Sequence, residues 1–331
     1  MSLLFEKAYG CLAGLALGDA LGMATEFLTP QQIEEHHGWV DGLVNAPSWH
    51  PHAALPRGRV TDDTEQALAL AGVYVHDGVM SAEAVAQAIL RWADEQGEHL
   101  ELYLGPSTRR ALAALRAGAD PRESGRAGKT NGAAMRAAPI GIVHPGDFDG
   151  ALRDVIEAAL PTHGTRAAIS AAAAVAWAVA EAMQADATVE SVLERAMAGA
   201  VRGREHGVWV WTAPIERRIE LARRLVREAA DERAALRALY DYVGVDMTVA
   251  ESIPTAFGLV ELAEGDPMRA AIYAANIGGD TDTIGAIAGA VCGALRGIGA
   301  IDGDLLRQVE EVNHLGLEQV ATDLVYRVHL T

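Results

Sequence analysis

Two sets of glycines recur at every fourth position, one near each end of the chain, and they constrain the fold more than any other feature. They are Gly10, Gly14, Gly18 and Gly22, and Gly285, Gly289, Gly293 and Gly297. Residues four apart lie on nearly the same face of an α-helix. Each set therefore predicts a helix with a strip of bare backbone along one face. Because glycine inside a helix costs about 1 kcal/mol relative to alanine, we expect a packing reason for these strips.

The simplest reason is that the two helices pack against each other. We predict that the helices within 3–22 and 284–297 are antiparallel partners at the centre of the fold. Such packing would place residues 19–26, at the end of the first helix, beside residues 280–283, at the start of the second.

Apolar residues recur with helical spacing over most of the chain, and no stretch alternates strictly enough to predict a β-strand. The predicted helices cover 3–22, 64–77, 81–96, 107–117, 149–160, 166–184, 188–201, 215–229, 231–241, 249–263, 266–275, 284–297 and 304–314. Half of the residues are hydrophobic but only 5% are aromatic, so small aliphatic side chains must form the core. With no repeat and no flexible linker, the pattern predicts an all-α protein in which residues 1–331 form one domain.

Charge and cysteine content limit the classes of function. The formal net charge is −18, and without a basic stripe the chain is not expected to bind nucleic acid generally. Cys11 and Cys292 lie in apolar helical patterns, which is typical of small buried residues in a reducing compartment. We therefore expect a cytoplasmic protein without a signal peptide. The apolar run 284–301 approaches membrane-span length, but its glycines and its acidic start favour a buried helix, so no membrane association is expected.

Two clusters of oxygen-bearing side chains precede helical patterns near opposite ends of the chain. One comprises Thr61, Asp62 and Asp63, and the other comprises Asp280, Asp282 and Thr283 after the pair Gly278-Gly279. Carboxylate and hydroxyl oxygens suit hard cations such as Mg²⁺ or Mn²⁺. If the clusters meet in space, they predict a site for two divalent cations.

Helix capping is the alternative interpretation of both clusters. Asp and Thr are favoured N-cap residues, and acidic side chains complement the helix dipole. Asp62 with Glu65 would form a pair resembling a capping box. A single cap needs only one such residue, however, and the second cluster places four in succession after two glycines.

Further candidates lie outside the two clusters. Glu26 follows the first glycine strip, where a carboxylate would face the same region, although an isolated Glu is more often a solvated surface charge. Asn131 and Gly132 resemble a turn before a helix, where backbone N–H groups bind phosphate. His163 precedes an alanine-rich helix and would equally serve as a cap or a satisfied core residue.

Residues 35–60 form a long irregular stretch rich in His, Pro and Gly, and long loops in compact domains are often functional. Its histidines, at 36, 37, 50 and 52, lack the spacing and cysteine partners of a zinc site. The chain also lacks a Walker A loop, a dinucleotide-binding glycine fingerprint and a Ser/His/Asp arrangement.

Taken in order, these motifs resemble the ADP-ribosylglycohydrolase family, which includes ADP-ribosylhydrolases and the J1 crystallins. The matching segments are GCLAGLALGDALGMATEF, VTDDTEQALALA, NGAAMRAAPIG, THGTRAA and AANIGGDTDTIGAIAGAVCGALRG. They run over nearly the full length, and the TDDT and GGDTDT motifs together are highly specific.

The resemblance implies a compact orthogonal helical bundle with a binuclear Mg²⁺ or Mn²⁺ centre in a cleft. It implies the metal ligands Thr61, Asp62, Asp63, Asp280, Asp282 and Thr283. It places Glu26 as the carboxylate of a mobile loop, and it assigns substrate contacts to Asn131, Gly132, Met135, His163, Gly278 and Gly279. The implied substrate carries ADP-ribose or a related ribosyl group.

Two departures from the family pattern concern specificity. Tyr103 stands where arginine-specific members have Asp, which questions an arginine leaving group. Thr130 replaces the glycine that usually precedes Asn-Gly. Neither position belongs to the metal set.

The expected reaction is hydrolysis of a glycosidic bond to ribose. Two cations would fix ribose hydroxyls and a water molecule, and an acid or base would assist the leaving group or the water. The candidates for catalysis are Glu26 and two cation-binding carboxylates, Asp62 and Asp282. Two alternatives are open: a hydrolase of small ribosides or nucleotides, and a non-catalytic ADP-ribose-binding or crystallin-like protein. The sequence leaves the oligomeric state unknown.

Overall fold

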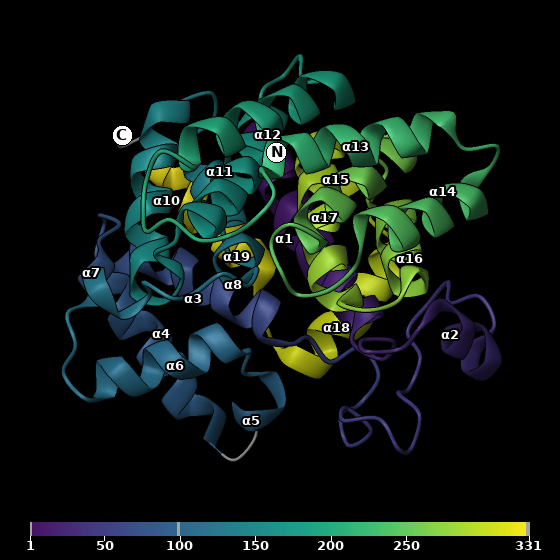
Figure 1. Ribbon diagram of the computed structural model, residues 1–331, viewed down its shortest axis with the longest axis horizontal. Helices are drawn as coiled ribbons and strands as arrows, with labels where there is room; N and C mark the ends of the chain where they lie inside the picture. The colour runs from purple at the N-terminus through teal and green to yellow at the C-terminus, as the bar shows by residue number, and fades with distance from the viewer. Residues whose placement is uncertain (1, 98–99, 329–331) are drawn as a thin grey trace.

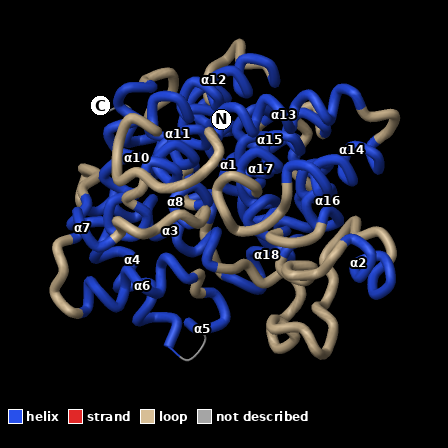
Figure 2. The backbone as a smooth tube through the Cα atoms, in the orientation of Figure 1, coloured by secondary structure: helices blue, strands red, loops and turns tan. Residues whose placement is uncertain are grey.

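The computed structural model describes residues 2–97 and 100–328, except for the side chain of Tyr103. Helices and loops make up these ranges, which contain no β-strand and only the isolated bridges Thr130–Thr248 and Thr165–Val208 (Figure 2). The prediction of an all-α protein is confirmed. The elements in chain order are α1 (Leu3–Gly22), α2 (Pro30–His37), α3 (Asp62–His76), α4 (Ala82–Gln96), α5 (Leu100–Tyr103), α6 (Pro106–Arg116), α7 (Pro121–Ser124), α8 (Gly132–Met135), α9 (Ala138–Val143), α10 (Phe148–His163), α11 (Arg166–Ala182), α12 (Val189–Gly203), α13 (Ile215–Glu228), α14 (Glu232–Ala238), the π-helix η2 (Leu239–Val243), α15 (Ser252–Leu262), α16 (Pro267–Ile277), α17 (Thr281–Arg296), the 3₁₀-helix η3 (Ile298–Ala300), α18 (Gly303–Asn313) and α19 (Leu317–Val328).

The first helix and the helix near the other end of the sequence lie side by side at the centre of the fold (Figure 1). Nearly all residues of α1 after Tyr9 and of α17 are buried. The alanine-rich helix α11 packs nearby and is itself buried along most of its length. The core is therefore built from small side chains that let helix backbones approach closely.

The glycine strips make this approach possible. A Cβ at Gly14 would lie 2.1 Å from the carbonyl oxygen of Gly289, and one at Gly18 would lie 2.0 Å from that of Gly285. Each Cβ would collide with the partner's backbone, so alanine does not fit. The pairing runs in opposite directions along the two helices, which confirms the predicted antiparallel packing.

One member of the predicted strips has a different role. Gly297 does not continue α17 but ends it, with φ 76° at the C-cap. Its own Cβ would meet nothing closer than 3.5 Å, at the carbonyl oxygen of Glu6. Gly297 is thus a helix terminator because its left-handed backbone conformation favours glycine.

The ends of the central helices are tied together by a buried lysine. Lys7 Nζ donates to the carbonyl oxygens of Ala182 at 2.7 Å, Leu295 at 3.0 Å and Ala294 at 3.4 Å. These carbonyls lie at the C-terminal ends of α11 and α17, where a cation is favoured by the helix dipole. Burial, and then the charge of Arg296, lowers the pKa of Lys7.

The cysteines and the apolar run near the C-terminus lie in this core. Cys11 and Cys292 are buried, unpaired thiols, and burial raises the pKa of both. Among the described helices, none combines the length and hydropathy that a membrane crossing requires.

The first prediction concerns the contact between the glycine strips. Replacing Gly14 with Ala would force a methyl group onto the backbone of α17. Overpacking typically costs about 1–3 kcal/mol, which outweighs the gain in helix propensity of about 1 kcal/mol. We expect a lower free energy of unfolding in urea denaturation.

Gly72→Ala is the matched control. Gly72 lies inside α3, and a Cβ there would meet only the flexible side chain of His76, at 3.8 Å. We expect this variant to be as stable as the wild type or more so, because only the propensity gain applies. Equal stability of the two variants would contradict the packing role of the strip.

Candidate active site

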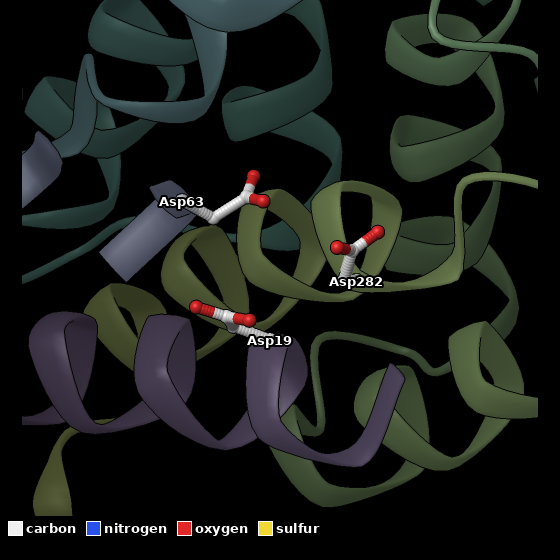
Figure 3. Close-up of side chains that lie close together, drawn as sticks. All are labelled: Asp19, Asp63 and Asp282. Carbon is white, nitrogen blue, oxygen red and sulfur yellow. The ribbon is translucent and has the colours of Figure 1, made fainter. Parts of the chain in front are cut away.

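Three helix ends meet on one side of the central pair: the C-terminal end of α1 and the N-terminal ends of α3 and α17. They bring together Asp19, Asp63 and Asp282, which can offer one oxygen each within 4.8 Å of one another (Figure 3). All three carboxylates are buried. The two oxygen-rich clusters of the sequence therefore do meet in space.

Asp19 is the member of this group that the sequence analysis missed as a candidate. Its carboxylate accepts hydrogen bonds from the backbone N–H groups of Thr61 and Thr64, at 3.0 and 3.1 Å, and from their hydroxyls, at 2.9 and 2.5 Å. Asp19 thereby joins the end of α1 to the start of α3. The available signal was an acidic residue within the apolar first helix, beside Gly18.

At the start of α3, the carboxylates lie in different hydrogen-bond environments. Asp62 Oδ2 accepts from Gln66 Nε2 at 2.8 Å. Asp63 Oδ2 accepts from the Thr283 hydroxyl at 3.3 Å and lies 3.0 Å from the Thr61 hydroxyl, whose single proton can be donated to either Asp63 or Asp19. Asp63 Oδ1 is buried and has no hydrogen-bond partner among the described residues.

Capping explains only part of this arrangement. Thr61 is the N-cap of α3, so this alternative is correct for one residue. The capping-box-like pair of Asp62 and Glu65 does not form, because Asp62 is already inside the helix and Glu65 accepts from Trp92 Nε1 at 2.8 Å.

At the start of α17, Asp280 occupies the N-cap position but its side chain does not cap the helix. Asp280 Oδ2 instead accepts from Asn131 Nδ2 at 2.5 Å. Asp282 Oδ1 is buried without a hydrogen-bond partner among the described residues. Both carboxylates thus face inward, where oxygens without donors favour a cation.

Glu26 reaches this group from the turn after α1. Its carboxylate offers an oxygen within 4.8 Å of oxygens of Asp280 and Asp282, and Glu26 Oε2 lies 3.4 Å from His52 Nδ1. The backbone around Glu26 is held by Gly279, which accepts from Phe27 N at 2.7 Å and donates to Leu28 O at 2.9 Å. Phe27 adopts a φ of 62°, which is uncommon for a non-glycine residue.

His50 and His52, from the long loop after α2, support this turn. His50 Nε2 lies 2.6 Å from the carbonyl oxygen of Glu26, and His52 Nδ1 lies 3.2 Å from that of Met23. In the described part of the chain these histidines belong to no group of three potential metal ligands. The loop therefore contributes to the site by supporting the turn of Glu26 and by placing His52 on the wall of the adjoining cleft.

The concentration of buried carboxylates disfavours their ionised forms. Burial, and then the charge of Asp282, raises the pKa of Asp19 to about 7, although hydrogen bonds from Thr64 and Thr61 oppose the shift. Burial followed by repulsion from Asp282 raises the pKa of Glu26, Asp62, Asp63 and Asp280 well above the ordinary values. Bound cations would relieve this repulsion.

The carboxylates form two groups, each of which could hold a metal ion. Besides the group of Asp19, Asp63 and Asp282, a second group of Glu26, Asp280 and Asp282 offers oxygens within 4.8 Å of one another. Asp282 belongs to both groups and would bridge them. An all-oxygen set with buried unpartnered oxygens suits Mg²⁺ or Mn²⁺ rather than softer metals.

A cleft opens beside the carboxylates. Its wall includes Asn131, Gly132 and Met135, as predicted for substrate contacts, and also Phe27 and Thr130. Apart from Asp19, the carboxylates lie in the wall of the cleft, where a bound molecule would meet them.

Three of the predicted substrate contacts do not lie on this wall. His163 is fully buried behind Gly132, whose Cβ would lie 2.7 Å from the His163 ring. Gly278 and Gly279, with φ 87° and 74°, turn the chain into α17 and pack against Leu28, Pro30 and Val245. These three residues therefore support the site without lining the cleft.

Of the two residues that depart from the family pattern, the structure describes the side chain of Thr130 only. Tyr103 ends α5, and its side chain lies outside the described residues. Thr130 lies on the cleft wall, with its hydroxyl 3.0 Å from His163 Nε2.

Comparison with known proteins agrees with this arrangement. A model of the ADP-ribosylglycohydrolase family matches residues 1–330. The chain is 37% identical over 322 residues to the uncharacterized protein YegU of Escherichia coli, covering 96% of each chain. It is 27% identical over 333 residues to the ADP-ribosylarginine hydrolase Tri1 of Pseudomonas putida, covering 97% of this chain and 78% of the relative.

A solved structure described as an ADP-ribosylglycohydrolase-related protein complex has 30% sequence identity and a TM-score of 0.72, over 99% of this chain and 100% of that chain. The fold is therefore shared along with the sequence motifs. The chain belongs to the ADP-ribosylglycohydrolase family of hydrolases, which act on glycosyl bonds.

Proposed function

We propose that this protein hydrolyses the glycosidic bond of ADP-ribosyl groups with the aid of two divalent cations. The observation that carries the proposal is the pair of carboxylate groups that share Asp282 in the wall of the cleft. Family membership supports the ribosyl substrate. The match to residues 1–330 also supports our proposal that the whole chain acts as one domain.

The proposed cation ligands are Thr61, Asp62, Asp63, Asp280, Asp282 and Thr283, together with Asp19, which the structure adds. Asp19 is the less direct candidate because donors from Thr61 and Thr64 already surround its carboxylate. When bound, two cations would orient ribose hydroxyls and make a water molecule a better nucleophile. Mg²⁺ and Mn²⁺ both suit the oxygen donors.

The chain's own contribution to the chemistry centres on Glu26. This carboxyl group lies beside Asp282 on a turn rather than a helix, and burial and neighbouring charges raise its pKa. A carboxyl group at this position can donate a proton to the leaving group when protonated, or accept one from water when ionised. Asp62 and Asp282 would assist by holding the reacting groups in fixed geometry.

The substrate side of the cleft receives the rest of the molecule. Asn131 is oriented by its donors to Asp280 and to Ser252 Oγ at 3.0 Å. Met135 and Phe27 provide apolar surface on the wall. We propose that these residues contact the ADP-ribosyl group, while Tyr103 leaves the identity of the leaving group open. A cytoplasmic location stays a prediction from the two buried thiols.

Cation binding should appear as added thermal stability. We expect Mn²⁺ or Mg²⁺ to raise the Tm of the EDTA-treated protein, by an amount equivalent to about 2.7 kcal/mol when the cation is at 100 times its dissociation constant. The cations must displace protons from carboxylates with raised pKa values, so apparent affinity should increase from pH 6 to pH 8. Differential scanning fluorimetry at both pH values measures this.

Asp282→Asn is the decisive variant because Asp282 is shared by both groups. Removing one buried negative charge should leave the cation-free protein as stable as the wild type or more so, while abolishing the stabilisation by Mn²⁺. A full Mn²⁺-dependent rise of Tm in this variant would refute the assignment of the ligands.

Glu26→Gln tests proton transfer. The amide keeps the shape of the side chain but cannot exchange a proton, so we expect kcat to fall by about 10²–10⁴-fold. ADP-ribose binding should change much less. Glu35→Gln, at an exposed position of α2, is the control and should retain full turnover. Wild-type turnover by the Glu26 variant would remove its catalytic role.

The linkage is identified by measuring ADP-ribose release from arginine-, serine- and small-molecule-linked ADP-ribose, with Mg²⁺ or Mn²⁺ and with EDTA. We expect cation-dependent release from at least one of them. Tight ADP-ribose binding without release would instead indicate a binding protein. Neither binding nor release, but cleavage of simple nucleosides, would indicate a hydrolase of small ribosides.

A further inference from the structure

Behind the cleft wall lies a buried, positively charged side chain, that of Arg136, which the proposed reaction does not use directly. Arg136 is fully buried, and among the described residues no carboxylate pairs with it. Burial lowers its pKa to about 10, and the charge of Asp62 opposes this shift, so the guanidinium stays positive at neutral pH. A charged guanidinium has only donors, and each of its hydrogen bonds therefore has a fixed direction.

One branch of these hydrogen bonds leads to the carboxylates. Arg136 Nη1 donates to Gln66 Oε1 at 2.9 Å. This fixes the orientation of the Gln66 amide, whose NH₂ group then donates to Asp62 Oδ2 at 2.8 Å. Arg136 thus determines that the Asp62 carboxylate meets the NH₂ group of Gln66 and not its carbonyl oxygen.

The other branch leads toward the substrate side. Arg136 Nη2 donates to Ala158 O at 3.1 Å and to Thr162 Oγ1 at 2.6 Å. The Thr162 hydroxyl, which accepts this bond, has one proton of its own, and His163 Nδ1 lies 2.8 Å away. No other acceptor is recorded for this hydroxyl in the described part of the chain, so the proton is directed at Nδ1.

His163 must then carry its own proton on the other nitrogen. Burial, and then the charge of Arg136, places the pKa of His163 well below its ordinary value, so the ring is neutral. With Nδ1 as acceptor, Nε2–H is the donor, and Thr130 Oγ1 lies 3.0 Å from it. Gly132 leaves room for this contact, because a Cβ there would lie 3.0 Å from Nε2 and 2.7 Å from Cε1.

The chain of hydrogen bonds ends at the cleft. Thr130 accepts from His163, so its hydroxyl proton is free to point away from the ring, and Thr130 lines the cleft. We infer that Arg136, Thr162 and His163 form a relay that makes the Thr130 hydroxyl a hydrogen-bond donor to an acceptor oxygen of the substrate. Thr130 is then a specificity-determining residue, and the three buried residues are positioning residues. This inference rests on the proposed function only for the identity of the substrate.

The first test detects the relay by NMR and does not depend on enzymatic activity. Long-range ¹H–¹⁵N NMR spectra distinguish the two neutral tautomers of histidine from the charged ring, and the His163 signal is assigned by its loss in His163→Gln. We expect the Nε2–H tautomer between pH 6.5 and pH 8. Thr162→Val should disturb this pattern, and Thr162→Ser, which keeps the hydroxyl, should retain it. An Nδ1–H tautomer or a charged ring in the wild type would overturn the relay.

The second test measures ADP-ribose affinity by calorimetry in the presence of Mn²⁺, using Thr130→Val and Thr130→Ser. Valine keeps the shape and removes the donor, so we expect affinity to weaken by about 3- to 10-fold, the value of one net hydrogen bond. Serine should bind within about 2-fold of the wild type. Equal affinity of the valine variant would overturn the role of Thr130.

The two tests separate this inference from the proposed function. If the wild type binds no ADP-ribose, the proposed substrate is wrong, and the NMR tautomer alone upholds or overturns the relay. If ADP-ribose binds but Thr130→Val does not change its affinity, the proposed substrate is retained and the donor role of Thr130 is refuted.

Discussion

The direct backbone contact between α1 and α17 is the constraint on which the rest of the structure depends. It fixes not only the core but also the relative positions of the residues at the C-terminal end of α1 and the N-terminal end of α17. At its end, a Cβ on Gly22 would lie 2.5 Å from the backbone of Asp282. Asp19 and Asp282 are therefore close because the glycines allow no other spacing. The same small residues that cost helix propensity thus position the two central carboxylates.

A group of buried negative charges needs favourable interactions that offset its mutual repulsion, and helix N-termini provide them. Two of the three helix ends that meet here, those of α3 and α17, are N-termini, where the dipole favours negative charge. Asp19 comes from the opposite end of α1 and lacks this benefit. Its compensation is the set of donors from Thr61 and Thr64, which are part of the next helix start. The remaining repulsion, seen in the raised pKa values, is what bound cations would remove.

The sequence predicted the helical class, the central pair of helices and the meeting of the two oxygen-rich clusters, because these depend on local spacing and on two unusual motifs. It missed Asp19 as a site residue, because an acidic residue in an apolar helix gains meaning only from its partner on α3. It also missed α19, although Leu317, Ala321 and Leu324 have helical spacing and are buried. The substrate contact assigned to His163 stays a prediction, and the structure places its ring behind Gly132, because a motif indicates proximity to a site but not the layer in which a side chain lies.

Rigid and adjustable parts of the site come from different kinds of structure. The aspartates are fixed by helix ends, whereas Glu26 lies on a turn kept in place by Gly279, His50 and the left-handed conformation of Phe27. A strained residue persists only where its surroundings determine it, and here the two backbone hydrogen bonds with Gly279 do so. The N–H of Glu26 also donates to the carbonyl oxygen of Gly22 at 3.0 Å, which ties the turn to the end of α1. Glu26, the proposed proton-transfer group, is thus the one carboxylate among these residues that lies on a turn rather than at a helix end, which suits a group that must act on both a leaving group and a water molecule.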